Sequence, residues 1–237
     1  MAPIFNTQNL ILSALSTDVH NQLLSKLEPI SLRYAEVLYE MDEPVDYVYF
    51  PNSGMVSLVS STQDGQSLEV GIVGYEGYVG LPIFLQDTVS PYRMVVQAEG
   101  TALRMRVDGF KAMCDQHGSL QELLHRYGQS LIREITQSAL CICFHHLGER
   151  FCRWLLICQD NVKSDEFHLT QEFLADMLGV RRAGVSVAAR AIQSEGLISY
   201  NRGQITILDR KRLEAASCEC YKIIRESFNW LHKHAES

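Results

Sequence analysis

Two adjacent arginines, Arg181 and Arg182, interrupt the apolar-periodic stretch LTQEFLADMLGVRRAGVSVAARAI at 169–192. A guanidinium can donate two parallel hydrogen bonds to a guanine edge or to a phosphate, so arginines at the start of a helix suit recognition of nucleic acid. Gly179 stands two residues before them, and glycine supplies the backbone freedom that a tight turn needs. The stretch therefore predicts two helices joined by a turn, with the arginines at the start of the second.

The residues around this turn have the pattern of a helix-turn-helix. Thr170 is a suitable N-cap for the first helix, and Ala175 is small where the two helices must cross closely. The apolar positions expected to be buried between the helices are Leu174, Leu178, Val180, Val185 and Ala188. A second helix placed in this way can enter a DNA major groove, where its first residues reach base edges. The alternative is a surface helix pair whose arginines are solvated.

A β-hairpin is predicted directly after the second helix. Two β-capable runs, 196–200 and 204–207, flank the turn Asn201-Arg202-Gly203. A helix-turn-helix followed by such a wing predicts double-stranded DNA as a partner. The predicted DNA contacts are Thr170, Gln171, Arg181, Arg182, Ala183, Ser186, Val187, Arg190 and Arg202.

The chain before this region changes its pattern twice. Residues 7–28 have helical periodicity, and residues 30–106 contain short strands rich in Val, Tyr and Met, separated by turn signals such as Asp64-Gly65. Many short strands with regular turns predict an antiparallel barrel or sandwich. Helical periodicity then returns with a short helix at 108–116, a long helix capped by Ser119, a helix at 148–160 and, after the wing, a last amphipathic helix at 209–232.

The long helix carries a narrow apolar stripe, whose residues follow at intervals of three or four: Leu124, Tyr127, Leu131, Ile135, Ala139 and Ile142. A narrow stripe on a long helix is typical of a seam between two chains. We therefore predict a homodimer with this stripe as its interface. An ordinary amphipathic helix packed on its own core is the alternative.

Composition limits the classes of protein to which the chain can belong. The 237 residues are 46% hydrophobic, enough to bury a core, and no apolar run approaches the roughly 20 residues of a transmembrane helix. The seven cysteines lack a disulfide spacing and the N-terminus lacks a secretory pattern, which favours the cytoplasm without membrane contact. The net charge is −7, yet residues 169–212 carry 7 Lys and Arg against 4 Asp and Glu, so one face can still bind DNA.

These segments, in this order, resemble the Crp/Fnr family of transcription regulators over nearly the whole chain. EVLYEMDEPVDYVYFPNSGMVSLV resembles the first barrel strands of a cyclic-nucleotide-binding domain, and residues 169–207 resemble the family's winged helix-turn-helix. The resemblance implies an α+β fold: an N-terminal antiparallel, jelly-roll-like β-barrel at 1–118, a long dimerisation helix at 119–147 and a C-terminal winged helix-turn-helix domain at 148–237. It also implies a homodimer on a two-fold-related DNA site, and RNA polymerase as a partner if the protein is an activator.

Both candidate recognition regions depart from the family members that bind cyclic AMP. Those members hold ribose and phosphate with a Gly-Glu pair and an Arg-Ser pair, and the corresponding candidate effector pocket here contains Gly80, Leu81, Tyr92 and Arg93. Without the carboxylate, a bound nucleotide would leave buried polar groups unpaired at about 1–3 kcal/mol each, so no dependence on cyclic AMP is predicted. In the recognition helix, Arg182, Ala183 and Val187 stand where those members have Arg, Glu and Arg, which predicts a different DNA site.

No cofactor, metal or catalytic residue is predicted, and the sequence does not identify the effector. The family's redox members bind an iron–sulfur cluster through N-terminal cysteines, whereas the first cysteine here is Cys114. Cys141 and His145 have a spacing that allows a shared metal but is common by chance, and Cys218 and Cys220 are expected to face different directions on the last helix. Residues 30–106 contain no His or Cys, which argues against a cupin-type metal enzyme, and no nucleophile elbow or phosphate loop is present. The remaining alternative is a scaffold or sensor dimer that does not bind DNA but has a ligand-binding barrel.

Overall fold

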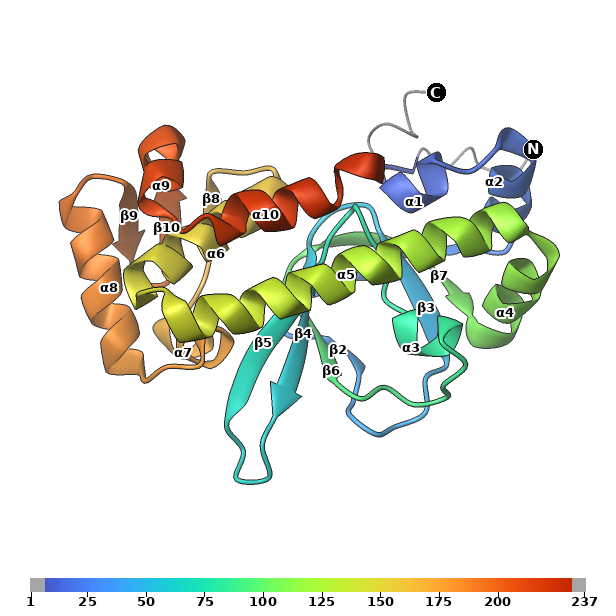
Figure 1. Cartoon of the computed structure of the whole chain (residues 1–237), viewed down its shortest axis with the longest axis horizontal. Coiled ribbons are helices and arrows are strands. Elements are labelled where there is room, and N and C mark those ends of the chain that lie inside the picture. The colour runs from blue at the N-terminus through green and yellow to red at the C-terminus, as the bar shows by residue number, and fades with distance from the viewer. Residues whose placement is uncertain (1–6, 232–237) are drawn as a thin grey trace. The chain divides into compact units, whose positions relative to one another are not determined.

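The computed structural model describes residues 7–231, which fall into two compact units (Figure 1). Among the described residues, unit 1 contains 7–58, 72–132 and 227–231, and unit 2 contains 59–71 and 133–226. The long helix α5 (Gly118–Phe144) and the hairpin of β4 (Met55–Ser61) and β5 (Ser67–Val73) contribute to both. Within the described residues, no helix combines the length and the apolarity that crossing a bilayer requires.

Unit 1 is a small antiparallel β-structure with short helices around it. Its other elements are α1 (Leu10–Ser13), α2 (Thr17–Leu24), β1 (Glu28–Leu32), β2 (Val37–Tyr39), β3 (Tyr47–Pro51), α3 (Leu81–Phe84), β6 (Arg93–Ala98), β7 (Gly100–Arg106) and α4 (Val107–Gln116). The strands form two sheets, β1-β7-β3 and β2-β6-β4-β5, and the pairings of β7 with β1 and β3 and of β2 with β6 are antiparallel. The expected jelly-roll-like barrel is thus present as two sheets of short strands.

The N-terminal segment predicted as helical at 7–28 forms two short helices, α1 and α2, separated by residues 14–16, and Asn9 starts the first. Its side-chain oxygen accepts a hydrogen bond from the Leu12 amide at 3.2 Å, while its side-chain nitrogen donates to the carbonyls of Pro51 (2.9 Å) and Gly77 (2.7 Å). Asn9 is fully buried, so these bonds both cap α1 and fasten it to unit 1.

The first half of the apolar stripe of α5 faces the core of its own chain, whereas Ile135 and Ile142 are half-buried and Ala139 is exposed. Leu124 and Tyr127 are 0% exposed and Leu131 is 1% exposed. The Tyr127 ring packs against Tyr78 with 5.1 Å between ring centroids, and against Phe228 with 6.0 Å. The interface predicted at Leu124, Tyr127 and Leu131 is therefore wrong, since periodicity locates an apolar stripe but does not say which surface covers it.

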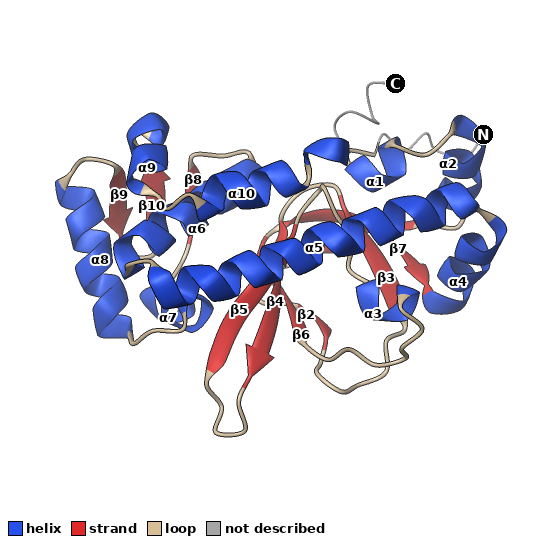
Figure 2. Ribbon diagram, in the orientation of Figure 1, coloured by secondary structure: helices blue, strands red, loops and turns tan. Residues whose placement is uncertain are grey.

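Unit 2 is mostly helical and contains a small sheet of three strands besides the outer part of the β4–β5 hairpin (Figure 2). Its elements are α6 (Leu147–Val162), β8 (Glu166–His168), α7 (Gln171–Leu178), α8 (Arg182–Ser194), β9 (Ile198–Asn201), β10 (Gln204–Ile207), α9 (Arg210–Ala216) and α10 (Cys220–Ser227). The predicted hairpin is β9–β10, and β8 adds a third antiparallel strand to it. The last helix predicted at 209–232 is divided into α9 and α10, because Ser217 adopts extended backbone angles (φ −83°, ψ 158°) and ends the first of them.

The outer half of the β4–β5 hairpin packs within unit 2. The Trp154 indole nitrogen, on α6, donates a 2.8 Å hydrogen bond to Glu69, on β5. Trp154 is 1% and Glu69 is 8% exposed. A buried carboxylate that accepts this bond orients the tryptophan, and the pair joins the hairpin to the helix that precedes the helix-turn-helix.

Candidate nucleic-acid interface

The turn between α7 and α8 has the geometry that the sequence predicts. The Thr170 hydroxyl accepts a 3.2 Å hydrogen bond from the Phe173 amide and so caps α7. Gly179 ends α7 in the left-handed region (φ 61°, ψ 42°), where a side chain is disfavoured. A Cβ placed on Gly179 would also lie 2.7 Å from a methyl carbon of Leu68 in the β4–β5 hairpin, so two independent constraints favour glycine here.

Helix α8 begins at Arg182, with Arg181 as its N-cap residue. Its inner face is buried through Val185, Ala188, Ala189 and Ile192. The opposite face is exposed at Arg181, Arg182, Ala183, Val187 and Arg190. Val187 is 60% exposed, which is unusual for a large apolar side chain and gives this face an apolar contact between its cations.

The wing carries its arginine at the tip of a tight hairpin turn. Arg202 and Gly203 both have positive φ, 49° and 85°, as the favoured two-residue hairpin turns require. A Cβ on Gly203 would lie 2.7 Å from the His168 side chain, on β8. The turn therefore fixes Arg202 in an exposed position at the end of β9–β10.

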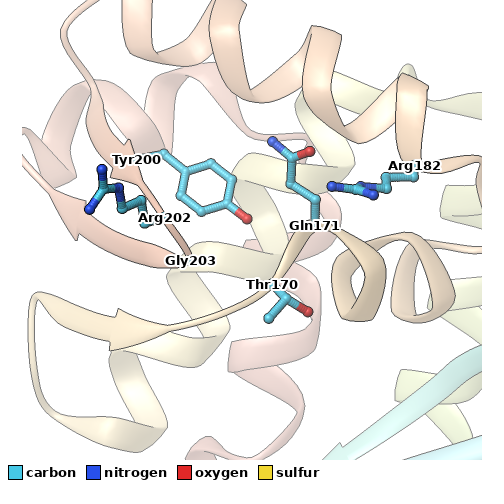
Figure 3. A pocket seen from close by; sticks show the side chains of 6 residues that line it. All are labelled: Thr170, Gln171, Arg182, Tyr200, Arg202 and Gly203. Atoms are coloured by element: carbon cyan, nitrogen blue, oxygen red, sulfur yellow. The ribbon is translucent and has the colours of Figure 1, made fainter.

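A hollow of about 350 Å³ lies between the wing, the start of α7 and the start of α8 (Figure 3). Six residues line it: Thr170, Gln171, Arg182, Tyr200, Arg202 and Gly203. Sequence reasoning named four of them and missed Tyr200 and Gly203, although both belong to the predicted hairpin. Gln171 accepts a 2.6 Å hydrogen bond from the Ser186 hydroxyl, which links the starts of the two helices.

Tyr200 closes the hollow on the side of the wing. Its hydroxyl donates to the Leu169 carbonyl at 2.8 Å, and its amide donates to the Gln193 side chain at 2.7 Å. Burial raises the pKa of this hydroxyl, while the charge of Arg182 lowers it by less. The Tyr200 hydroxyl is therefore uncharged at neutral pH, and its hydrogen bond holds the wing against the segment before α7.

The arginines of this face lack acidic partners within residues 7–231. Arg93, Arg104 and Arg210 form ion pairs with glutamate or aspartate, the last with a 2.8 Å bond to Asp160. Arg181, Arg182, Arg190 and Arg202 form none with the described acids, and all four are exposed. An acidic chain thus keeps four uncompensated cations on the helix-turn-helix and wing, which favours an anionic partner there.

The candidate effector residues differ in burial and in charge pairing. Gly80 precedes the short helix α3, and Leu81, where a carboxylate would be needed, is buried at 8% exposure. Arg93 is paired with Glu40 at 3.1 Å, with both side chains nearly half exposed. Burial raises the pKa of Tyr92 to about 12. Leu81 therefore cannot accept a hydrogen bond from a hydroxyl group, and Arg93 already has a carboxylate partner.

The prediction for the cysteines near the end of the chain is wrong. Cys218 and Cys220 were expected to face apart on one helix, but Cys218 lies in the break between α9 and α10, and both thiols point to the same place. Their ligand atoms lie within 4.8 Å of one another and of those of Cys141 and His145. The hydrogen bond from Cys218 lowers the pKa of Cys141, and the same bond raises the pKa of Cys218.

Comparison with known proteins identifies both parts of the chain. Residues 29–117 match the cyclic nucleotide-binding domain, and residues 149–216 match the Crp-like helix-turn-helix domain. No curated protein matches the chain in sequence. The two domains in this order show that the chain belongs to the Crp/Fnr family of transcriptional regulators, and not to a class of enzymes.

Solved structures share the fold at low sequence identity. FixK2 from Bradyrhizobium japonicum is 17% identical, with 81% of this chain and 98% of that chain covered and a TM-score of 0.65. The c-di-GMP-responsive global regulator CLP from Xanthomonas campestris is 13% identical, with 82% and 100% covered and a TM-score of 0.67. A CRP/FNR-family transcriptional regulator from Thermus thermophilus is 19% identical, with 80% and 98% covered and a TM-score of 0.67.

Proposed function

We propose that the protein is a sequence-specific DNA-binding transcription regulator. The observation that carries this proposal is the exposed face of α8 and the wing, where four arginines have no acidic partner among the described residues. Arg182 lies in the first turn of α8, and in this proposal its guanidinium donates to a guanine edge in a major groove. Arg181 and Arg202 stand at the margins of this face, where phosphates of the backbone would lie.

Selection of bound DNA from a random pool tests the proposal. We expect enrichment of a two-fold-related sequence whose half-sites contain a guanine read by Arg182. Because Ala183 cannot accept a hydrogen bond from a cytosine amine, and Val187 offers an apolar contact to a thymine methyl, the half-site should differ from that of the cyclic-AMP-binding members. A pool that gains no sequence preference would contradict the proposal and favour a scaffold or sensor dimer.

We further propose that the protein acts as a homodimer through the exposed face of α5. Three large apolar side chains remain exposed there: Ile132 at 53%, Leu140 at 42% and Phe144 at 78%. Their spacing of eight and four residues, with Ala139 exposed beside them, keeps them along one side of the helix. Ile135 and Ile142, from the predicted stripe, are half-buried at the edge of this face.

A third proposal is that DNA binding does not require cyclic AMP. Its support is the buried Leu81 at the position of the ribose acceptor and the Arg93–Glu40 ion pair at the position of the phosphate ligand. Titration calorimetry with cyclic AMP and cyclic GMP should show no sub-micromolar binding. Sub-micromolar affinity for either nucleotide would overturn the proposal.

A further inference from the structure

Four side chains from two distant parts of the chain meet inside unit 2. Cys141 and His145 come from the end of α5 and the residue after it, while Cys218 and Cys220 come from the junction of α9 and α10. The Cys141 and Cys218 sulfurs are 3.5 Å apart, and the Cys220 sulfur is 3.4 Å from His145 Nδ1. The three cysteines are at most 5% exposed.

The local backbone explains how these residues meet. Cys141 and His145 are one helical turn apart and lie on the same side of α5. The extended backbone at Ser217 ends α9, so Cys218 lies in the break and Cys220 opens α10. Because Cys218 lies outside regular helix, the helical spacing does not hold the two cysteines apart, and both sulfurs lie close to the pair from α5.

The distances suit a single metal ion held by four ligands. A tetrahedral ion with metal–sulfur bonds of about 2.3 Å places its ligand atoms about 3.8 Å apart. All four ligand atoms here lie within 4.8 Å of one another, so small side-chain adjustments reach that geometry. An iron–sulfur cluster distributes its ligands over several iron atoms and needs wider separations. A Cys141–Cys218 disulfide would need about 2.05 Å between sulfurs, and both thiols are free.

The surroundings are those of a metal-binding group. His145 presents Nδ1 toward Cys220, and its Nε2 lies 3.2 Å from a Glu219 carboxylate oxygen. A carboxylate on the outer nitrogen fixes the tautomer in which Nδ1 carries the lone pair. Gln137 donates a 3.1 Å hydrogen bond to the Cys220 sulfur. The buried Arg153 guanidinium acts electrostatically on Cys141 and Cys218, which offsets the net negative charge of three thiolates on a divalent ion.

We propose that Cys141, His145, Cys218 and Cys220 bind one Zn²⁺ ion in a tetrahedral site of three sulfurs and one nitrogen. Each thiol loses its proton to solvent as its sulfur–zinc bond forms, and His145 gives its Nδ1 lone pair while Nε2–H donates to Glu219. No oxidation or reduction is involved. The ion fastens the end of α5 to the α9–α10 junction within unit 2. This site does not depend on the proposed DNA contacts.

The test uses the full-length protein purified under reducing conditions. We expect elemental analysis to find about one zinc ion per chain in the wild type. The zinc content should be at least tenfold lower in Cys218→Ser, Cys220→Ser and His145→Ala. Cys143→Ser is the matched control, because Cys143 is exposed and lies two residues from Cys141 on the same helix; it should keep its zinc. A chelator should lower the unfolding temperature of the wild type and leave that of Cys218→Ser unchanged.

Replacement of zinc by Co²⁺ tests the ligand set without any variant. Wild-type protein loaded with Co²⁺ should show sulfur-to-cobalt charge-transfer absorption and the intense visible bands of a tetrahedral ion. Reduced wild-type protein that contains no zinc and develops no such bands would overturn the proposal, as would equal zinc content in the wild type and all three variants. Metal-free protein with a Cys141–Cys218 disulfide, detected by mass spectrometry, would also overturn it.

Discussion

At the scale of single residues, Arg182 and its neighbours separate two kinds of DNA contact. A bidentate bond to guanine distinguishes one base pair, whereas a phosphate contact adds affinity to every sequence alike. Arg182 opens α8 and lines the hollow beside the wing, while Arg181 precedes the helix and Arg202 occupies the hairpin tip. Substitution of Arg182 should therefore have a different effect on DNA binding from substitution of Arg181 or Arg202.

We expect Arg182→Ala to lose about 1–3 kcal/mol of discrimination at one guanine of each half-site. The cause is the loss of two parallel hydrogen bonds that only guanine can accept at that position. Fluorescence anisotropy with the selected site and its single-base variants measures this change. Full base discrimination in Arg182→Ala would show that α8 binds DNA in another orientation.

Arg181→Ala and Arg202→Ala should weaken binding to all sequences by similar factors. Each lost phosphate contact reduces the number of counterions released, so the dependence of log affinity on log salt should flatten by about one unit per site. Affinities at two salt concentrations, for selected and random DNA, check this expectation. If either variant changes the preferred base, that arginine contacts a base edge instead.

At the scale of elements, the helix-turn-helix depends on the turn at Gly179. Alanine there must hold a left-handed conformation that costs about 1–2 kcal/mol, and its Cβ would also crowd Leu68. We expect Gly179→Ala to lower the free energy of unfolding, measured by denaturant titration, by at least this amount. Adding Leu68→Ala to Gly179→Ala should remove the clash with the new Cβ but not the cost of the left-handed backbone. Gly148→Ala is the control, because nothing lies within 4 Å of its added Cβ and it stands in helix α6.

The exposed face of α5 gives a second prediction at this scale. Ile132→Glu together with Leu140→Glu would place like charges opposite each other in a dimer, so we expect a monomer by light scattering and weaker DNA binding. Met41→Glu, at a side chain 38% exposed outside α5, should remain dimeric. A wild-type protein that is monomeric at micromolar concentration would rule out the dimer itself.

Much of this arrangement could be predicted from the sequence because local signals specify it. Local chemistry sets the backbone conformation at Thr170, at Gly179 and at the Arg202-Gly203 turn. The structure has the predicted cap or turn at each of these positions. The face of α5 could not be predicted, since Leu131 and Ile132 are both apolar and only tertiary packing decides which is buried. The break at Ser217 contains neither glycine nor proline, so nothing in the pattern separates α9 from α10, and the group of Cys141, His145, Cys218 and Cys220 was missed with it.

At the scale of the whole molecule, both units bury thiols that resist ionisation. Burial raises the pKa of Cys114, in unit 1, and of Cys152, in unit 2, from 9.0 to about 12. Between these values the unfolded chain loses the thiol protons while the folded chain keeps them, so the free energy of unfolding falls as pH rises. We expect denaturant midpoints to fall as the pH rises from 9.0 toward about 12. Cys114→Ala and Cys152→Ala should each make this fall shallower; an unchanged slope in both would contradict the assignment.

The two tryptophans of the chain supply a separate optical probe for each unit. Trp154 is buried in unit 2 with its indole nitrogen bonded to Glu69, whereas Trp230 belongs to unit 1 and lies beneath the Arg126 guanidinium, 4.2 Å from the ring centroid. Indole emission responds to such neighbours, so Trp230→Phe leaves a fluorophore that reports on the β4–β5 hairpin and α6. Trp154→Phe leaves one that reports on the end of the chain near α5. A candidate effector can then be added to each variant in turn. The variant whose emission spectrum shifts identifies the unit in which the effector acts.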